Sequence, residues 1–119
     1  MNIDNFHPLI LSVGKAARNA DWNWQNVCSP FARIYYIVKG EADVEIDGVS
    51  HKLIPGRMYL IPPFTTHSTR CKGLFVHYYI HIYDDCITGN TLFEEYDFPF
   101  EIKSHHKEEN LFERLCVLN

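Results

Sequence analysis

Hydrophobic and polar positions alternate through much of this chain, most regularly between Glu41 and Asp47, where acidic residues alternate with alanine, valine and isoleucine. Side chains along a strand point to opposite faces in turn, so this period of two predicts an antiparallel strand with one buried face and one solvated, acidic face. Asp47-Gly48 then supplies the positive φ angles that a tight turn prefers. The pattern therefore predicts a β-hairpin in the middle of the chain.

Further strands are expected on both sides of this hairpin. Runs rich in β-branched and aromatic residues lie between turn-forming residues at positions 8–18, 22–28, 32–38, 58–61 and 73–83. Strands at such spacing are typical of a barrel or sandwich. Trp22 and Trp24 stand two apart in one run and should share a face, as core residues or as a ligand-stacking pair. A loop over 84–91 and an irregular extended segment over 92–103 should follow.

The last part of the chain has a different period. Ser104 is a candidate N-cap, and two glutamates follow where a first helical turn favours acids. Leucines then recur at helical spacing, namely Leu111, Leu115 and Leu118. No glycine, proline or basic last turn marks the end of this helix. We therefore expect a C-terminal helix that is truncated in this sequence.

We divide the sequence into a β-domain over residues 1–103 and the start of a dimerisation or linker helix over residues 104–119.

Lys and Arg number 11 against 15 Asp and Glu, a net charge of −4, so the chain lacks the basic surplus with which proteins bind nucleic-acid backbones. No apolar run approaches the roughly 20 residues of a membrane span. The four cysteines are scattered, which favours reduced thiols in a cytoplasmic protein.

The segment 33–67 carries the most specific motif of the sequence. Gly56, Pro62 and His67 follow the spacing G-x5-P-x4-H between short predicted strands. This pattern resembles the second motif of the cupin β-barrel, in the variant that forms the effector-binding half of AraC-type transcription regulators. The resemblance implies a mainly β fold, a cupin-type double-stranded β-helix (jelly-roll barrel) followed by a C-terminal α-helix.

The first cupin motif is poorly matched, and this bears on metal binding. That motif ends at Gly40, which puts Arg33 where the family carries its metal-binding glutamate, and no histidine stands just upstream. In the second motif Phe64 replaces a glycine and Cys71 an asparagine. Only His67 remains of four metal ligands, and a guanidinium replaces a carboxylate. We therefore expect no metal and no other cofactor.

The resemblance implies sensing rather than catalysis. In AraC-type regulators this domain binds a small molecule, often a sugar, and dimerises through C-terminal helices, while a separate helix-turn-helix domain binds DNA. No helix-turn-helix pattern occurs in this sequence, so DNA contact would belong to a domain that it lacks. We expect a homodimeric effector-binding domain that is not an enzyme. The alternatives are a metal-free sugar isomerase or epimerase with His67 as base, and a free-standing carbohydrate-binding cupin.

Five residues are candidates for effector binding: Arg33, Tyr35, His67, His77 and Tyr79. The cupin glutamate position faces the barrel interior, so Arg33 should point inward and be mostly buried, and alternation puts Tyr35 on the same face. A buried guanidinium needs an anionic or oxygen-rich partner. Arg33 could form a salt bridge with Glu41 or Glu94, or it could anchor a sugar hydroxyl or a carboxylate of the ligand.

The two faces of the 73–83 strand differ in character. One is mainly aliphatic, and the other carries aromatic and polar-tipped side chains, namely Phe75, His77, Tyr79, His81 and Tyr83. The second face could line a pocket, since ligand sites are largely aromatic with few polar groups. It could equally be an outer face covered by the terminal helix or a partner subunit. His77 and His81 stand roughly 13 Å apart along a strand, at the far limit for sharing one metal ion.

Overall fold

The computed structural model describes residues 8–19, 21–84, 98–103 and 107–118. These ranges contain the strands β1 (Pro8–Asn19), β2 (Ala32–Ile46), β3 (Val49–Leu53), β4 (Arg57–Ile61), β5 (His67–Asp84) and β6 (Glu101–Lys103), and the helix α2 (Lys107–Leu118). The expected mainly β fold with a C-terminal helix is confirmed. The predicted loop over 84–91 lies almost wholly outside the described residues. Among those residues, no helix is long and apolar enough to cross a membrane.

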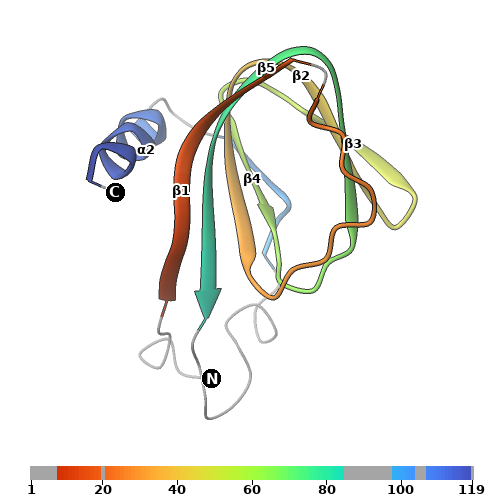
Figure 1. The fold of residues 1–119 in the computed structure, drawn as a ribbon, viewed down its shortest axis with the longest axis horizontal. Helices are drawn as coiled ribbons and strands as arrows, with labels where there is room; N and C mark the ends of the chain where they lie inside the picture. Colours follow the sequence, from red (N-terminus) through yellow and green to blue (C-terminus); the bar gives the residue numbers. More distant parts are fainter. Residues whose placement is uncertain (1–7, 20, 85–97, 104–106, 119) are drawn as a thin grey trace.

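The strands form one antiparallel sheet in the order β1-β5-β2-β4-β6, with β3 paired to β2 (Figure 1). β2 and β5 are the longest strands, with 15 and 18 residues, and they pair with each other along most of their length. In Figure 1 both strands arch over the top of the molecule and descend on the other side. The sheet therefore wraps around an interior instead of lying flat.

β2 joins two segments that the sequence predicts as separate strands, 32–38 and 41–47. The expected break at Gly40 is wrong, because the strand continues through it with a register shift on either side. Gly40 has a φ of 99°, a conformation that glycine adopts without steric cost and that lets a strand bend at a bulge. The bend turns one long strand into two arms of the same curled sheet.

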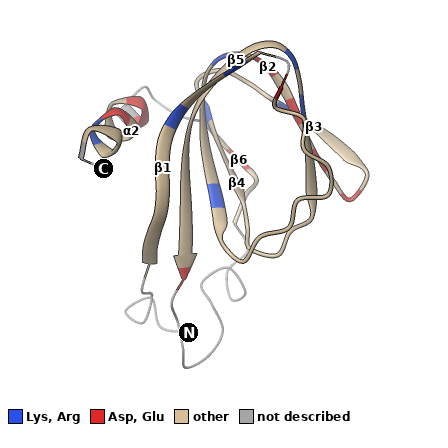
Figure 2. Ribbon diagram, in the orientation of Figure 1, with Lys and Arg blue, Asp and Glu red and all other residues tan. Residues whose placement is uncertain are grey.

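The hairpin predicted at Asp47-Gly48 is confirmed, with φ values of 52° and 77° and an antiparallel pairing of β2 with β3. The alternation before it is confirmed as well, because Ala42 and Val44 are buried, whereas Glu41 and Glu45 are exposed and Asp43 is only partly buried. Figure 2 shows acidic positions along this hairpin, whereas Lys and Arg are spread over several elements of the fold. One face of the hairpin therefore packs inward and the other meets water.

The strand predicted at 22–28 is wrong. Asn26 has a φ of 52°, which interrupts an extended backbone, and Val27 forms an isolated bridge with His67. Hydrogen bonds along this irregular segment instead tie it to the beginning of β5. The segment thus closes one side of the curled sheet without joining it as a strand.

Trp22 and Trp24 both line the cavity described below, but they are buried to different extents. Trp22 is 6% exposed and packs in the core, whereas Trp24 is 53% exposed. Thr69 on β5 fixes this region: its backbone N–H donates to Trp24 O at 2.9 Å, and its hydroxyl oxygen accepts from Trp24 N–H at 3.0 Å. Core packing, one of the two expected uses of this pair, is confirmed for Trp22 alone.

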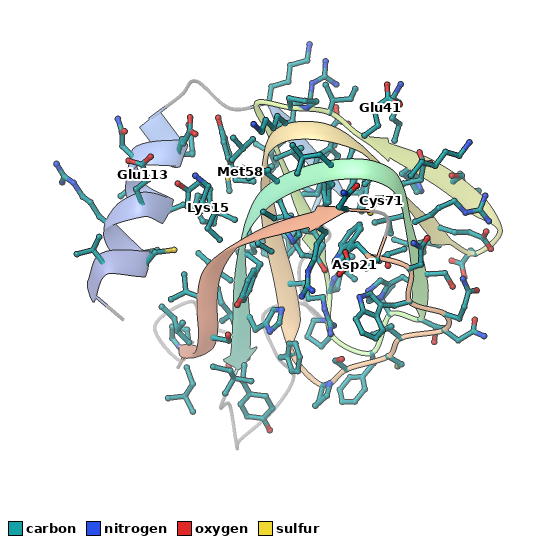
Figure 3. The ribbon with its side chains drawn as sticks, turned by 45° about the horizontal axis from the view of Figure 1, so that its top comes forward. Lys15, Asp21, Glu41, Met58, Cys71 and Glu113 are labelled. Atoms are coloured by element: carbon teal, nitrogen blue, oxygen red, sulfur yellow. The ribbon has the colours of Figure 1, made fainter. Side chains whose placement is uncertain are left out.

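α2 packs on the outer face of the sheet. Phe112 is 4% exposed, and its ring centre lies 5.9 Å from that of Tyr36 and 5.8 Å from that of Tyr78. The Tyr78 hydroxyl donates to Glu113 at 3.3 Å. Figure 3 shows Glu113 and Lys15 in the seam between the helix and the strands. The helix is therefore held against the sheet by the packing of Phe112 on two tyrosine rings and by a hydrogen bond to Glu113.

The predicted helix is confirmed over residues 107–118, but its apolar side is divided. Leu115 packs against the sheet beside the Phe112 anchor, whereas Leu111 is 59% exposed. The N-cap position Ser104 and the side chain of Leu118 lie outside the described residues. Self-association through this helix stays a prediction.

Candidate functional site

The curled sheet forms a cavity of about 380 Å³, partly open to solvent, on the face opposite α2. Its lining comes from β1, β2, β5 and the irregular segment that follows β1. All five residues predicted as effector-binding line it, namely Arg33, Tyr35, His67, His77 and Tyr79. The aromatic, polar-tipped side of β5 is therefore the inner side over the residues from 75 to 81, which answers a question that the sequence left open.

Strand pairing arranges the lining in rows. Across β1, β5 and β2, the aligned positions are Ser12, His81 and Arg33, then Gly14, Tyr79 and Tyr35, then Ala16, His77 and Ile37. A Cβ atom on Gly14 would lie 2.6 Å from Tyr79 Oη. The missing side chain on β1 thus leaves room for the tyrosine to lie across that strand.

Arg33 faces the cavity and is mostly buried. Its Nη1 donates to Ser29 Oγ at 3.0 Å, and its guanidinium lies 4.7 Å from the centre of the Phe31 ring. The expected inward and mostly buried position is confirmed, although the Phe31 ring on which the side chain rests is itself only partly covered. These two contacts hold the guanidinium in one orientation.

The proposed salt bridge between Arg33 and Glu41 is also wrong. Glu41 points to the surface, where its carboxylate lies 3.9 Å from Lys52 Nζ (Figure 3 labels Glu41). Glu94, the other proposed partner, lies outside the described residues. Among the residues that are described, no carboxylate pairs with Arg33. Arg33 therefore has Ser29 and Tyr35 as polar neighbours, and no described carboxylate neutralises its charge.

His77 lies deep in the cavity wall, with 2% of its surface exposed. The Phe75 ring stacks on it at 4.6 Å between centres, and Trp22 and Tyr35 pack at 5.2 and 5.3 Å. Burial, with a smaller effect of Arg18, lowers the pKa of His77 to about 4, so the ring is neutral at pH 7. Its Nδ1 has no hydrogen-bond partner within the described part of the chain.

His67 and Tyr35 are also uncharged at neutral pH. His67 Nδ1 lies 3.0 Å from Thr65 O, and since a carbonyl only accepts, this nitrogen carries the proton and Nε2 is the acceptor. Burial lowers the pKa of His67, and the nearby Arg33 lowers it further. Burial raises the pKa of Tyr35 to about 12, although Arg33 opposes the shift. The cavity therefore offers neutral donors and acceptors around the guanidinium of Arg33.

Several lining residues were not predicted as site residues. His81 could have been included, because the alternation that selects the predicted β5 residues selects it too. Arg18 enters with Ser12 and Ala16 from β1, which pairs with β5. No local signal in the sequence shows that this side of β1 faces inward. Trp22 enters because its segment is tied to β5 by long-range hydrogen bonds.

The cavity residues do not fit a bound metal ion. Arg33 occupies the motif position of the metal-binding glutamate, so a metal cation would meet a guanidinium instead of a carboxylate. Among the described residues, no group of three or more His, Cys, Asp or Glu side chains is placed to hold a metal ion. The absence of a metal stays a prediction.

The fold is similar to those of several solved cupins. A cupin superfamily protein from Desulfitobacterium hafniense aligns with a TM-score of 0.56 and 19% identity, over 66% of this chain and 78% of that one. The Cnp3 cupin domain of Schizosaccharomyces pombe gives 0.55 and 16%, over 66% and 64%. A candidate mannose-6-phosphate isomerase from Ralstonia eutropha gives 0.54 and 19%, over 66% and 82%. The predicted cupin-type barrel is confirmed.

No curated protein matches the sequence. Residues 9–84, in contrast, match the family described as the AraC-like ligand binding domain. The matched range runs from β1 to the end of β5 and includes every described residue that lines the cavity. The chain belongs to the family of AraC-like ligand-binding domains.

Proposed function

We propose that this domain binds a small polar molecule in its cavity and controls the DNA-binding domain of a transcription regulator, which the sequence does not include. The observation that carries the proposal is the cavity of about 380 Å³ within the family-matched range. Its volume lies in the range of roughly 300–1,000 Å³ that is typical of small-molecule sites. Its aromatic walls and few polar groups are also typical of such sites.

The regulatory part of the proposal requires two copies and a separate DNA contact. Leu111 and Val117 on α2 are 59% and 84% exposed, and they could pack against a second copy. Lys and Arg are spread over several elements of the described structure (Figure 2), so DNA binding is assigned to another domain. A fusion to a DNA-binding domain that acts only as a dimer would report ligand-dependent pairing in cells.

Thermal unfolding tests the binding part of the proposal. The chain is titrated with monosaccharides and with small organic acids, and a bound compound should raise the midpoint temperature in a concentration-dependent way. Ala16→Phe fills the cavity beside His77, and Ala17→Phe adds the same side chain at the neighbouring exposed position. Stabilisation should persist in Ala17→Phe and disappear in Ala16→Phe. If no compound stabilises the chain, or if both variants respond equally, the proposal fails.

A second candidate function is a metal-free isomerase or epimerase. It is favoured by the neutral His67, whose Nε2 could accept a proton from a substrate in the cavity. The described lining contains no Asp, Glu or Lys as an acid-base partner, and a Tyr35 hydroxyl with a pKa of about 12 is a weak acid. Interconversion of aldoses and ketoses followed by NMR, and abolished in His67→Gln, would replace the sensing proposal with this one.

A further inference from the structure

The cavity has a charge opposite to that of the whole chain. The sequence carries a net charge of −4, yet the described lining contains Arg18 and Arg33 and no Asp or Glu. Arg18 Nη1 lies 3.5 Å from Asp21 Oδ2, in an exposed pair that partly offsets its charge. Arg33 has no such partner in the described part of the chain. The positive potential of the interior is therefore centred on Arg33.

The Arg33 guanidinium is held ready for an anion. Ser29 Oγ accepts one of its five N–H donors, and Phe31 supports its flat side. Tyr35 also interacts with the guanidinium, whose planar arrangement of N–H donors matches the two oxygens of a carboxylate. His81 stands in register with Arg33 on β5. Burial lowers the pKa of His81 to about 4, so it adds no second positive charge at pH 7.

The rest of the cavity suits a planar body with a polar end. Rings of Trp22, Tyr35 and Tyr79 line it, and flat molecules pack well against such rings. Deeper along β5, four residues or roughly 13 Å from His81, lies His77 with its unpaired Nδ1. This nitrogen is enclosed by its neighbours, so a ligand group meets His77 only at the part of the ring that lines the cavity.

We infer that the effector is a small organic carboxylate with a planar body, whose carboxylate binds Arg33 and whose other end brings a hydrogen-bonding group to His77. This inference rests on the proposed function, because it names the chemical class of the molecule that the cavity takes. Neutral sugars are the competing class. Their hydroxyls would leave the charge of Arg33 without a counterion, which is unfavourable in a partly desolvated site.

The inference is tested with pairs of probes that have the same shape and differ in charge. Benzoate is compared with benzamide, and 4-hydroxycinnamate with 4-hydroxycinnamamide, by calorimetric titration of the 119-residue chain. Each acid should bind at least roughly tenfold more tightly than its amide, because a charge-assisted pair with a guanidinium is stronger than a neutral hydrogen bond. The 4-hydroxy compound, which reaches further along the cavity, should bind more tightly than benzoate.

Arg33→Gln should weaken the binding of both acids by roughly tenfold to a hundredfold and remove the preference over the amides. Arg114→Gln makes the same change at an exposed position of α2 and should leave the preference intact. If Arg33→Gln does not fold, Arg33→Lys is used in its place. This variant keeps the positive charge but loses the planar pair of N–H donors. It should therefore retain only part of the preference for acids over amides.

The outcomes separate this inference from the proposed function. Amides that bind as tightly as the acids, or a preference unchanged in the Arg33 variants, would overturn the inference. If only neutral monosaccharides bind, and Ala16→Phe blocks them, the inference is wrong while the proposed function stands. If neither acids, amides nor sugars bind, both are wrong.

Discussion

Tyr35 and Tyr36 are neighbours on β2 and both are buried, but they lie on opposite faces of the sheet. Tyr35 belongs to the cluster around the cavity with Trp22, whereas Tyr36 belongs to the cluster beneath α2 with Phe112. The same division runs along β5, where alternate side chains join one cluster or the other. Because the side-chain period of a strand is two, one pair of strands supplies both a binding surface and a packing surface.

The two faces differ in how completely their polar groups are satisfied. On the helix face, the Tyr78 hydroxyl has Glu113 as a partner. On the cavity face, His77 Nδ1 has no hydrogen-bond partner and Arg33 has no carboxylate, as far as the described residues show. Unsatisfied buried groups lower the stability of a fold. The cavity face therefore holds a positive charge that no described carboxylate neutralises, as a site for an anion requires.

The largest expected effect comes from substituting the two neighbouring tyrosines. Tyr36→Ala should lower the free energy of unfolding by roughly 3–5 kcal/mol, because it removes a fully buried ring from beneath α2. Tyr35→Phe removes only a hydroxyl from the cavity and should cost less than about 1.5 kcal/mol. Urea denaturation measures both values.

Ligand titration compares the contributions of Tyr35 and Tyr36 to binding affinity. Tyr35→Phe should weaken the binding of a cavity ligand several-fold, whereas Tyr36→Phe, which makes the same change on the helix face, should leave binding unchanged. Equal losses of affinity in the two variants would show that the faces are not functionally separate.

Acid should destabilise the cavity face through His77. Its pKa falls from an ordinary value of 6.5 to about 4 in the folded chain, so the unfolded chain binds a proton first as the pH falls. Stability is therefore unaffected above pH 6.5 and decreases between pH 6.5 and pH 4, by roughly 3 kcal/mol for this group. His81, whose pKa is lowered to about 4 as well, acts in the same direction.

Denaturation at pH 7 and pH 4.5 measures this effect. His77→Phe keeps a flat ring in the aromatic cluster and should show a clearly smaller loss of stability between the two pH values, with the contribution of His81 remaining. His51→Phe changes a histidine on β3, outside the described cavity lining, and should behave like the unmodified chain. An identical pH dependence in all three proteins would exclude His77 as a cause.

The helix face leads to a smaller predicted effect on self-association. Leu111 and Val117 are exposed on α2, and burying about half of each at an interface contributes roughly 1 kcal/mol per side chain. A Leu111→Asp, Val117→Asp variant should therefore raise the dimer dissociation constant at least roughly tenfold, as measured by sedimentation. Leu74→Asp, at an exposed position of β5, is the control. A monomer in every case would mean that α2 packs only on its own sheet.

No effect is expected from chelation. Arg33 stands where a metal-binding cupin has its glutamate, so EDTA should leave both the unfolding midpoint and ligand binding unchanged. Elemental analysis should find well below one transition-metal ion per chain. Near-stoichiometric zinc, iron, manganese or nickel would contradict our interpretation of the cavity as a site for an organic anion.

Local patterns in the sequence carry a good part of this structure. The alternation from Glu41 to Asp47 predicts a strand with one buried face, and Asp47-Gly48 predicts the turn that follows it. The spacing of Gly56, Pro62 and His67 indicates the barrel. These features depend on side-chain period and on backbone preferences of single residues, both of which are local properties.

The tertiary structure decided which face became the interior and which residues met there. Arg18 and Trp22 reach the cavity because β1 and the segment after it bond to β5, and long-range pairing is not written in any short stretch of sequence. The segment at 22–28 has strand-forming residues, but its backbone is held in an irregular conformation by hydrogen bonds to the beginning of β5. Alternation shows that a strand has two different faces. Only the closing of the sheet and the docking of α2 determine which face is enclosed, because burial depends on elements far apart in the chain.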